Sequence, residues 1–190
     1  MAQKKIQNKR TVLDFIKDDH DRMRSLIRKF RDNLDAKPEK RSALLRRIRD
    51  EVVPHARAEE DVVYNNMRKV DAPTDWVYHG FLEHAETEAQ LHALEAMEAI
   101  HVEWRKLAEK FCDDLEHHIR EEEEELFPQV RAAFSHAELE GMADKFRSQK
   151  PEIRERGAIS NTIAMVGNLV TPSLNEVQNF VREKVTSWRH

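Results

Sequence analysis

The chain has 190 residues, of which 36% are charged and 39% are apolar, and its formal net charge at pH 7 is -4. Four glycines and six prolines are too few for the turns of an all-β sandwich or barrel, and the near balance of charge gives no general attraction to nucleic acid. Abundant Glu, Lys, Arg, Leu and Ala favour an all-α protein. The single cysteine, Cys112, excludes an internal disulfide and favours a reducing, cytoplasmic location.

Four long segments have the apolar spacing of three, four and seven residues that is typical of helices. The first covers residues 11–33 and the second covers 39–69, with a proline-containing turn between them. The third covers 75–97 and the fourth covers 102–132. Helices of this length joined by short turns must cover one another's apolar stripes. The pattern therefore predicts an up-down-up-down four-helix bundle, with extra helices toward the C-terminus.

The expected organisation is a flexible N-terminal tail at residues 1–10, the bundle at 11–134, and a helical extension at 135–190 that packs on the bundle. A capping-box pattern, Ser135-His136-Ala137-Glu138, predicts the start of a short helix, and Thr171-Pro172-Ser173 predicts the start of another. The apolar face of that last helix covers the bundle or joins two copies. No apolar run is long enough for a signal peptide or a membrane span. We expect a monomer or weak homodimer with no membrane or nucleic-acid partner.

The second and fourth predicted helices contain a matched segment. It reads HARAEEDVVY from His55 and HIREEEEELF from His118. Each copy has a glutamate four residues after the histidine, so both side chains lie on one helix face. The first and third helices add one histidine each, His20 and His84. The chain therefore consists of two similar helical hairpins, each with a histidine on one helix and a His-x-x-x-Glu pair on the next.

Distances from the predicted turns place these side chains at one level of the bundle. His20 and His55 lie about 16 and 18 residues from the first turn, and His84 and His118 lie equally far from the third. The six candidate ligands are His20, His55, Glu59, His84, His118 and Glu122. Two buried carboxylates without partners cost several kcal/mol each, and the same stripes carry no Lys or Arg. One histidine alone would be an ordinary core residue, but a bound divalent cation accounts for all six together.

The chemistry of this set favours two ions. Imidazole and carboxylate ligands suit iron, manganese or zinc. Two six-coordinate ions offer about twelve positions, of which bridging Glu59 and Glu122, four histidines and a shared oxygen fill about ten. About two positions stay open for a small molecule. Within the acidic run 121–125 only Glu122 is expected to face inward, and the unmatched histidines, His79 and His117 among them, are expected at the surface.

The pattern resembles the hemerythrin-like, or HHE cation-binding, family. The residues that carry the resemblance are Asp19-His20, His55-x-x-x-Glu59, Glu83-His84, and His118-x-x-x-Glu122 followed by Leu126-Phe127-Pro128. The resemblance covers roughly residues 11–132. It implies a four-helix bundle that holds a non-heme di-iron centre of two iron ions joined by an oxygen atom. The family's roles include binding of dioxygen, sensing of oxygen or iron, and responses to peroxide or nitric oxide.

The sequence departs from the oxygen-carrying branch of that family, which has His-x-x-x-His on the third helix. Gly80 lies four residues before His84, and Glu88 lies four residues after it. Either one histidine is missing or Glu88 replaces it, and Tyr64 is a further residue that could join the site. The leading function is binding or sensing of dioxygen or a related small oxidant, by a binding protein rather than an enzyme. The alternatives are an oxidoreductase for peroxide or nitric oxide, and a divalent-metal buffer or metal-free structural bundle.

Overall fold

A computed structural model describes residues 9–70, 75–97 and 102–167, with side chains described as far as residue 153. Within these ranges the protein is all-α and has no strand. The elements in chain order are α1 (Val12–Arg31), α2 (Pro38–Glu59), η1 (Glu60–Tyr64), α3 (Asn65–Met67), α4 (Asp75–Ala96), α5 (Val102–Glu121), η2 (Glu122–Leu126), α6 (Phe127–Ala133) and α7 (His136–Gly167).

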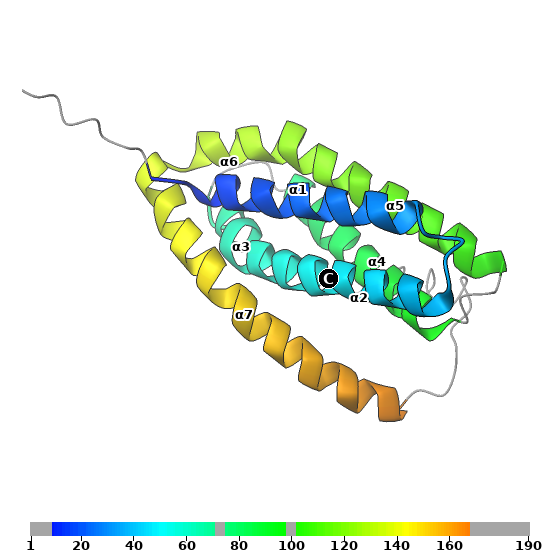
Figure 1. Ribbon diagram of the computed structural model, residues 1–190. Coiled ribbons are helices and arrows are strands. Elements are labelled where there is room, and N and C mark those ends of the chain that lie inside the picture. The colour runs from blue at the N-terminus through cyan, green and yellow to red at the C-terminus, as the bar shows by residue number, and fades with distance from the viewer. Residues whose placement is uncertain (1–8, 71–74, 98–101, 168–190) are drawn as a thin grey trace, which may run out of the picture.

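Four antiparallel helices form the bundle (Figure 1). Helix α1 packs against α2 and α5, and α4 packs against the same two helices, so the four close into a ring. Each of the four helical segments predicted from apolar spacing is present within a few residues of its predicted ends. The predicted all-α bundle is therefore confirmed.

Helix α7 lies outside the ring and runs along α1 and α2 (Figure 1). The capping box at its start is present, since the Glu138 carboxylate accepts hydrogen bonds from the Ser135 backbone N–H at 2.8 Å and from its hydroxyl at 2.7 Å. The helix then continues to Gly167, so the expectation of a short helix was wrong. Packing against two bundle helices supports its length. The division at residue 134 stays a prediction, and the helix expected from Thr171 lies outside the described residues, as do residues 1–8.

Two apolar clusters fill the bundle, one toward each end. One contains Met23, Phe30, Ile48, Leu91 and Phe111, and the other contains Ile16, Val63, Val77, Leu126 and Phe146. On each bundle helix the candidate ligands lie in sequence between residues of the two clusters. The polar level is therefore sealed from both ends of the bundle. None of the helices in the described ranges is both long and apolar enough to cross a membrane.

Two π-helical turns, η1 and η2, interrupt α-helical geometry at equivalent places in the two hairpins. The backbone N–H of Asn65 bonds to the carbonyl of Glu60, and that of Phe127 bonds to the carbonyl of Glu122, each across five residues. Such a turn holds an extra residue and changes which side chains share a face; π turns are frequent at functional sites. Apolar spacing does not indicate either turn; a proline, Pro128, lies two residues after η2, and no Gly or Pro lies within η1.

Candidate metal centre

The six predicted side chains converge at mid-bundle, each no more than 6% exposed. The Oε2 atom of Glu59 lies 3.4 Å from Nε2 of His55 and 3.8 Å from Nε2 of His84. Glu59 thus lies between a histidine of its own helix and a histidine of the other hairpin.

Glu122 occupies the equivalent position in the second hairpin. Its Oε2 atom lies 3.1 Å from Nε2 of His20 and 3.6 Å from Nε2 of His118. The Nε2 atoms of His84 and His118 are 3.0 Å apart. Donor atoms within 4.8 Å of one another form two groups, His20–His55–Glu122 and His84–His118–Glu122, so Glu122 belongs to both. Each group could hold a metal ion, and Glu122 would then contact both.

Several of these atoms are buried without a hydrogen-bond partner. They are Nε2 of His20 and His55, both carboxylate oxygens of Glu59, and Oε2 of Glu122. Leaving a buried polar atom unsatisfied costs about 1–3 kcal/mol. A cation between them would satisfy all five atoms, so the residues present fit a metal. That the six side chains are the ligands stays a prediction.

Carboxylates outside the cluster fix the orientation of the histidines. Within the first hairpin, Nδ1 of His55 donates to Oδ2 of Asp19 at 3.1 Å. Within the second, Nδ1 of His118 donates to Oε2 of Glu83 at 2.9 Å. Because a carboxylate can only accept, the Nδ1 proton is fixed there. In the neutral ring Nε2 then presents its lone pair to the centre, as in many metal sites.

The other two histidines are held from the opposite hairpin. Nδ1 of His20 donates to Oε1 of Glu123 at 2.9 Å, and Nδ1 of His84 donates to Oε1 of Glu60 at 3.1 Å. Both acids follow directly after a candidate ligand glutamate and lie in the π turns. The expectation that only Glu122 of the acidic run faces inward was therefore wrong. The π turn places Glu123 against His20.

The supporting role of these four acids was not predicted from the sequence, although Asp19 and Glu83 stood in the family pattern and the repeat contained the signal. Asp19 and Glu83 each precede a histidine, and Glu60 and Glu123 each follow a glutamate of a His-x-x-x-Glu pair. An acid adjacent to a ligand points to a different face of an ideal α-helix. Only the packing of the hairpins and the π turns show that it meets a histidine of another helix.

Comparison with known proteins agrees with this geometry. The family model described as the hemerythrin HHE cation binding domain matches residues 11–130. The chain belongs to the hemerythrin HHE cation-binding family. The match and the two groups of donor atoms make it a metal-binding domain.

A curated relative is the protein named "DNA nickase" from Nostoc sp. (strain PCC 7120 / SAG 25.82 / UTEX 2576). It is 26% identical over 147 residues, which are 76% of this chain and 40% of the relative. The chain thus spans well under half the length of that relative. No solved structure matches the chain.

Burial and neighbouring charges shift the pKa values of the candidate ligands in different directions. Burial, together with the neighbouring Glu122, raises the pKa of Glu59 well above its ordinary value. Burial opposes the charge of Glu122, but His118 and His20 outweigh it and lower the Glu122 pKa. Burial would also lower the pKa of His118, but Glu122, Glu83 and Glu59 raise it to about 9. At neutral pH His118 is therefore protonated and Glu122 is ionised, while the surroundings of Glu59 favour its neutral form.

A buried phenol, that of Tyr64, contacts the cluster of six candidate ligands. The Tyr64 hydroxyl donates a hydrogen bond to Oε1 of Glu122, and burial, with Glu122 and Glu59, raises the Tyr64 pKa far above its ordinary value. The Tyr64 ring stacks on His84 at 5.3 Å between centroids. At the same place in the other hairpin, Phe127 stacks on His20 at 6.0 Å. Tyr64 thus joins the site as a hydrogen-bond donor.

Glu88 does not join the centre. Its side chain is 32% exposed and its Oε2 atom pairs with the Arg57 guanidinium. Although Glu88 lies four residues after His84 on the same stripe, the packing of α4 against α2 directs its carboxylate to a cation at the rim. A seventh ligand from this position is not present.

Gly80 is required by the close approach of Tyr64. A Cβ atom at position 80 would meet the Tyr64 hydroxyl and lie 2.7 Å from Cζ and 2.8 Å from Cε2. The phenol therefore fills the space that any side chain at position 80 would need, so a histidine four residues before His84 cannot be accommodated beside Tyr64.

We predict that Gly80→Ala destabilises the fold and breaks the hydrogen bond between Tyr64 and Glu122. Alanine favours a helix by about 1 kcal/mol over glycine, but overpacking costs about 1–3 kcal/mol. Urea unfolding measures the balance. The matched control is Gly141→Ala in α7, where a Cβ meets nothing within 4 Å and a gain of about 0.5–1 kcal/mol is expected. Equal gains for the two substitutions would contradict the prediction.

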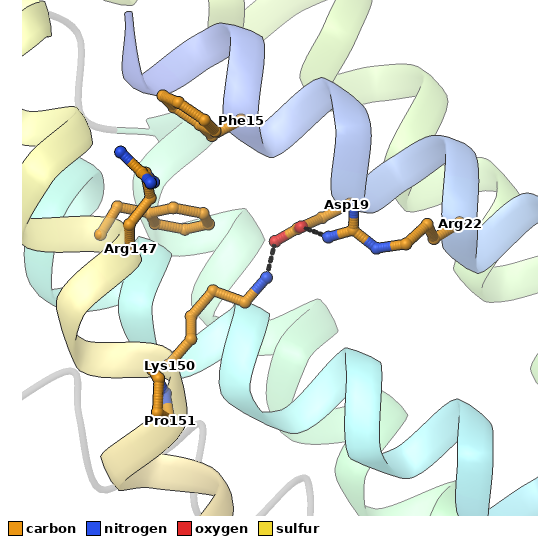
Figure 2. Close-up of a pocket in the computed structure, with 7 residues that line it drawn as sticks. Phe15, Asp19, Arg22, Arg147, Lys150 and Pro151 are labelled. Atoms are coloured by element: carbon orange, nitrogen blue, oxygen red, sulfur yellow. Dashed lines mark hydrogen bonds and ion pairs between the residues drawn. The ribbon is translucent and has the colours of Figure 1, made fainter.

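Helix α7 takes part in holding His55. Lys150 and Arg22 both pair with Asp19, the residue that accepts the His55 Nδ1 proton (Figure 2). Burial would raise the Asp19 pKa, but His55 and Lys150 lower it to about 2. The Phe146 ring lies edge-on to the His55 ring at 5.9 Å between centroids. A cleft of about 420 Å³ between α1 and α7 opens onto Asp19. The part that α7 plays in holding His55 was not predicted from the sequence.

Proposed function

We propose that this HHE domain holds two iron ions and binds dioxygen, or a related small oxidant, at a coordination position that its own ligands leave open. The single observation that carries the proposal is the set of buried, unpartnered Nε2 and carboxylate atoms at one bundle level. Four histidines and two carboxylates are a donor set suited to iron, and manganese or zinc would fit the same atoms. Six protein ligands leave room for a small molecule in the coordination of two ions.

The protein's own residues have three roles in this proposal. The Nδ1 carboxylates fix each imidazole so that Nε2 faces the centre, which raises its basicity as a ligand. The apolar clusters on both sides separate the centre from the two ends of the bundle. Tyr64 holds Glu122 in place through its hydroxyl. Iron bound there would supply the electrons that small oxidants need for binding or reduction.

Anaerobic loading with ferrous iron followed by exposure to air tests this function. We expect about two irons per chain that resist gel filtration, and new near-ultraviolet absorption bands after air is admitted. Return of the ferrous spectrum under vacuum supports reversible binding of dioxygen. Steady consumption of hydrogen peroxide or nitric oxide would instead support an oxidoreductase. Iron retained with no spectral response to any oxidant would leave a metal buffer.

Metal affinity should rise with pH. The pKa of Glu59 is raised well above its ordinary value and that of His118 is about 9, so protons compete with a cation at both side chains. Each displaced proton strengthens apparent binding about tenfold per pH unit, and for His118 the gain ends near its pKa of about 9. Cobalt titrations between pH 6 and 8, in buffers of different ionisation enthalpy, count the released protons. Affinity that falls with rising pH would contradict the expected protonation.

The name of the Nostoc relative gives a second candidate, cleavage of one strand of DNA. Two metal ions held side by side can cleave phosphodiesters, and the cleft beside Asp19 carries the cations Arg22, Arg147 and Lys150. Incubation of supercoiled plasmid with the metal-loaded protein under anaerobic conditions tests it. Nicking by the wild type but not by Glu122→Gln would favour hydrolysis at the centre. Nicking that requires air would identify oxidative damage.

We also propose that the protein acts as a monomer or weak homodimer in the cytoplasm. Cys112 is a free cysteine with a buried thiol, and burial raises its pKa to about 12. Such a thiol is a small core residue and is poorly reactive. Sedimentation of the metal-loaded protein measures the oligomeric state.

A further inference from the structure

A His-x-x-x-Glu pair outside the core lies on each helix of the α4–α5 hairpin. His79 and Glu83 are four residues apart on α4, and His117 and Glu121 are four residues apart on α5. Nε2 of His79 lies 3.4 Å from Oε1 of Glu83 and 3.3 Å from Oε2 of Glu121. The two helices therefore bring one imidazole and two carboxylates together at the surface.

The spacing of these atoms is that of a coordination shell. Ligand atoms at 2.0–2.1 Å from a tetrahedral ion lie about 3.4 Å from each other. Both distances from His79 agree with this value, and all three donor atoms lie within 4.8 Å of one another. Oε2 of Glu121 is buried and has no hydrogen-bond partner, so its contact with His79 is not a hydrogen bond. A cation between the three side chains would satisfy that oxygen and balance two negative charges.

We propose that His79, Glu83 and Glu121 form a further metal site on the domain surface, which takes a divalent transition cation of the zinc or ferrous type. Three protein ligands leave at least one position for water, as in open zinc sites. The His79 side chain is 50% exposed, so a cation reaches the site directly from solvent. The site is therefore exchangeable and weaker than the buried centre.

His117 supports the site without acting as a ligand. The Arg120 guanidinium donates to Nδ1 of His117 at 2.8 Å, so in the neutral ring the proton is on Nε2. That Nε2–H group faces Oε1 of Glu121 at 3.2 Å. His117 therefore holds Glu121 by one oxygen and leaves the other oxygen to the cation.

Glu83 connects the surface site to the buried one. Its Oε1 atom faces His79, while its Oε2 atom accepts the Nδ1 proton of His118. A cation on Oε1 draws negative charge away from His118. The Glu83 carboxylate would thus contact the surface ion directly and the core ion only through His118, so the two ions have no ligand in common.

Zinc titration by calorimetry tests the site, with wild type, His79→Ala and Glu121→Gln compared. We expect the wild type to bind one more zinc ion per chain, in a weaker phase, than its core centre holds. Each variant should weaken that phase by at least about tenfold, which is the loss that removal of even an outer metal-site partner can cause. The tight phase should be unchanged in both.

The matched control is His136→Ala. His136 and Glu140 form the same i,i+4 pair on α7, with 3.1 Å between Nε2 and Oε1, but among the described residues no third donor groups with them. This variant should keep the weak phase. A weak phase that survives both His79→Ala and Glu121→Gln would overturn the proposal. The same titration of Glu122→Gln tests the core proposal separately, because this variant should lose the tight phase and keep the weak one.

Discussion

Replacing Glu122 by glutamine should empty the core centre of both ions. The Oε2 atom of Glu122 contributes to both groups of donor atoms, and it lies 3.1 Å from His20 and 3.6 Å from His118. Glutamine keeps the size of the side chain and can still accept the Tyr64 hydroxyl. The substitution removes one negative charge from a buried set that must balance two divalent cations. His55→Ala touches only one group and should cost about one ion.

Metal analysis after gel filtration, which removes a weakly held surface ion, measures the loss. We expect about two ions per chain in the wild type, about one in His55→Ala, and close to none in Glu122→Gln. Glu124→Gln is the matched control, because Glu124 is exposed in the same acidic run and should keep full metal content. Far-ultraviolet circular dichroism confirms that each variant is folded. Wild-type metal content in both core variants would refute the assignment of the six ligands.

Removing the metal should lower the melting temperature by about 10 °C. A ligand that binds only the folded state stabilises it by about 4 kcal/mol when its free concentration is 1,000 times its dissociation constant. For a chain of this size each kcal/mol shifts the melting temperature by about 2–4 °C. The stripped protein should stay folded, because the proton on His118, whose pKa is about 9, replaces part of the lost positive charge, and the raised pKa of Glu59 favours its neutral form.

Calorimetric melting with bound metal and after chelation measures this difference. The Glu122→Gln protein provides the control, since a chelator should not change its melting temperature. A melting temperature of the wild type that is equal with and without chelator would show that the core ions are not coupled to folding. The same scans at two metal concentrations separate binding from a general salt effect.

Much of the fold and the six candidate ligands followed from the sequence. The helices were predictable because apolar residues recur with helical spacing, and the level of the site followed from counting residues between turns. His55 and Glu59 share a face because they are four residues apart, and α-helical geometry alone fixes that relation. The duplicated segment then supplied the second half of the site.

Other features depend on contacts between helices that no local pattern describes. The π turns place Glu60 and Glu123 against histidines of the opposite hairpin, and apolar spacing does not mark either turn. Lys150 lies 131 residues after Asp19 in sequence, yet pairs with it across α7 and α1. His79 and Glu121 were expected at the surface without partners. Only the register of α4 against α5 shows that they meet.

The pairing of Tyr64 in one hairpin with Phe127 in the other makes the two carboxylates mechanically unequal. Tyr64 tethers Oε1 of Glu122, whereas both oxygens of Glu59 have no hydrogen bond to the protein. A tethered carboxylate keeps its position when its surroundings change, and an untethered one can swing between two binding modes. If the centre rearranges when a small molecule binds, we therefore expect the Glu59 side chain to move and the Glu122 side chain to keep its position.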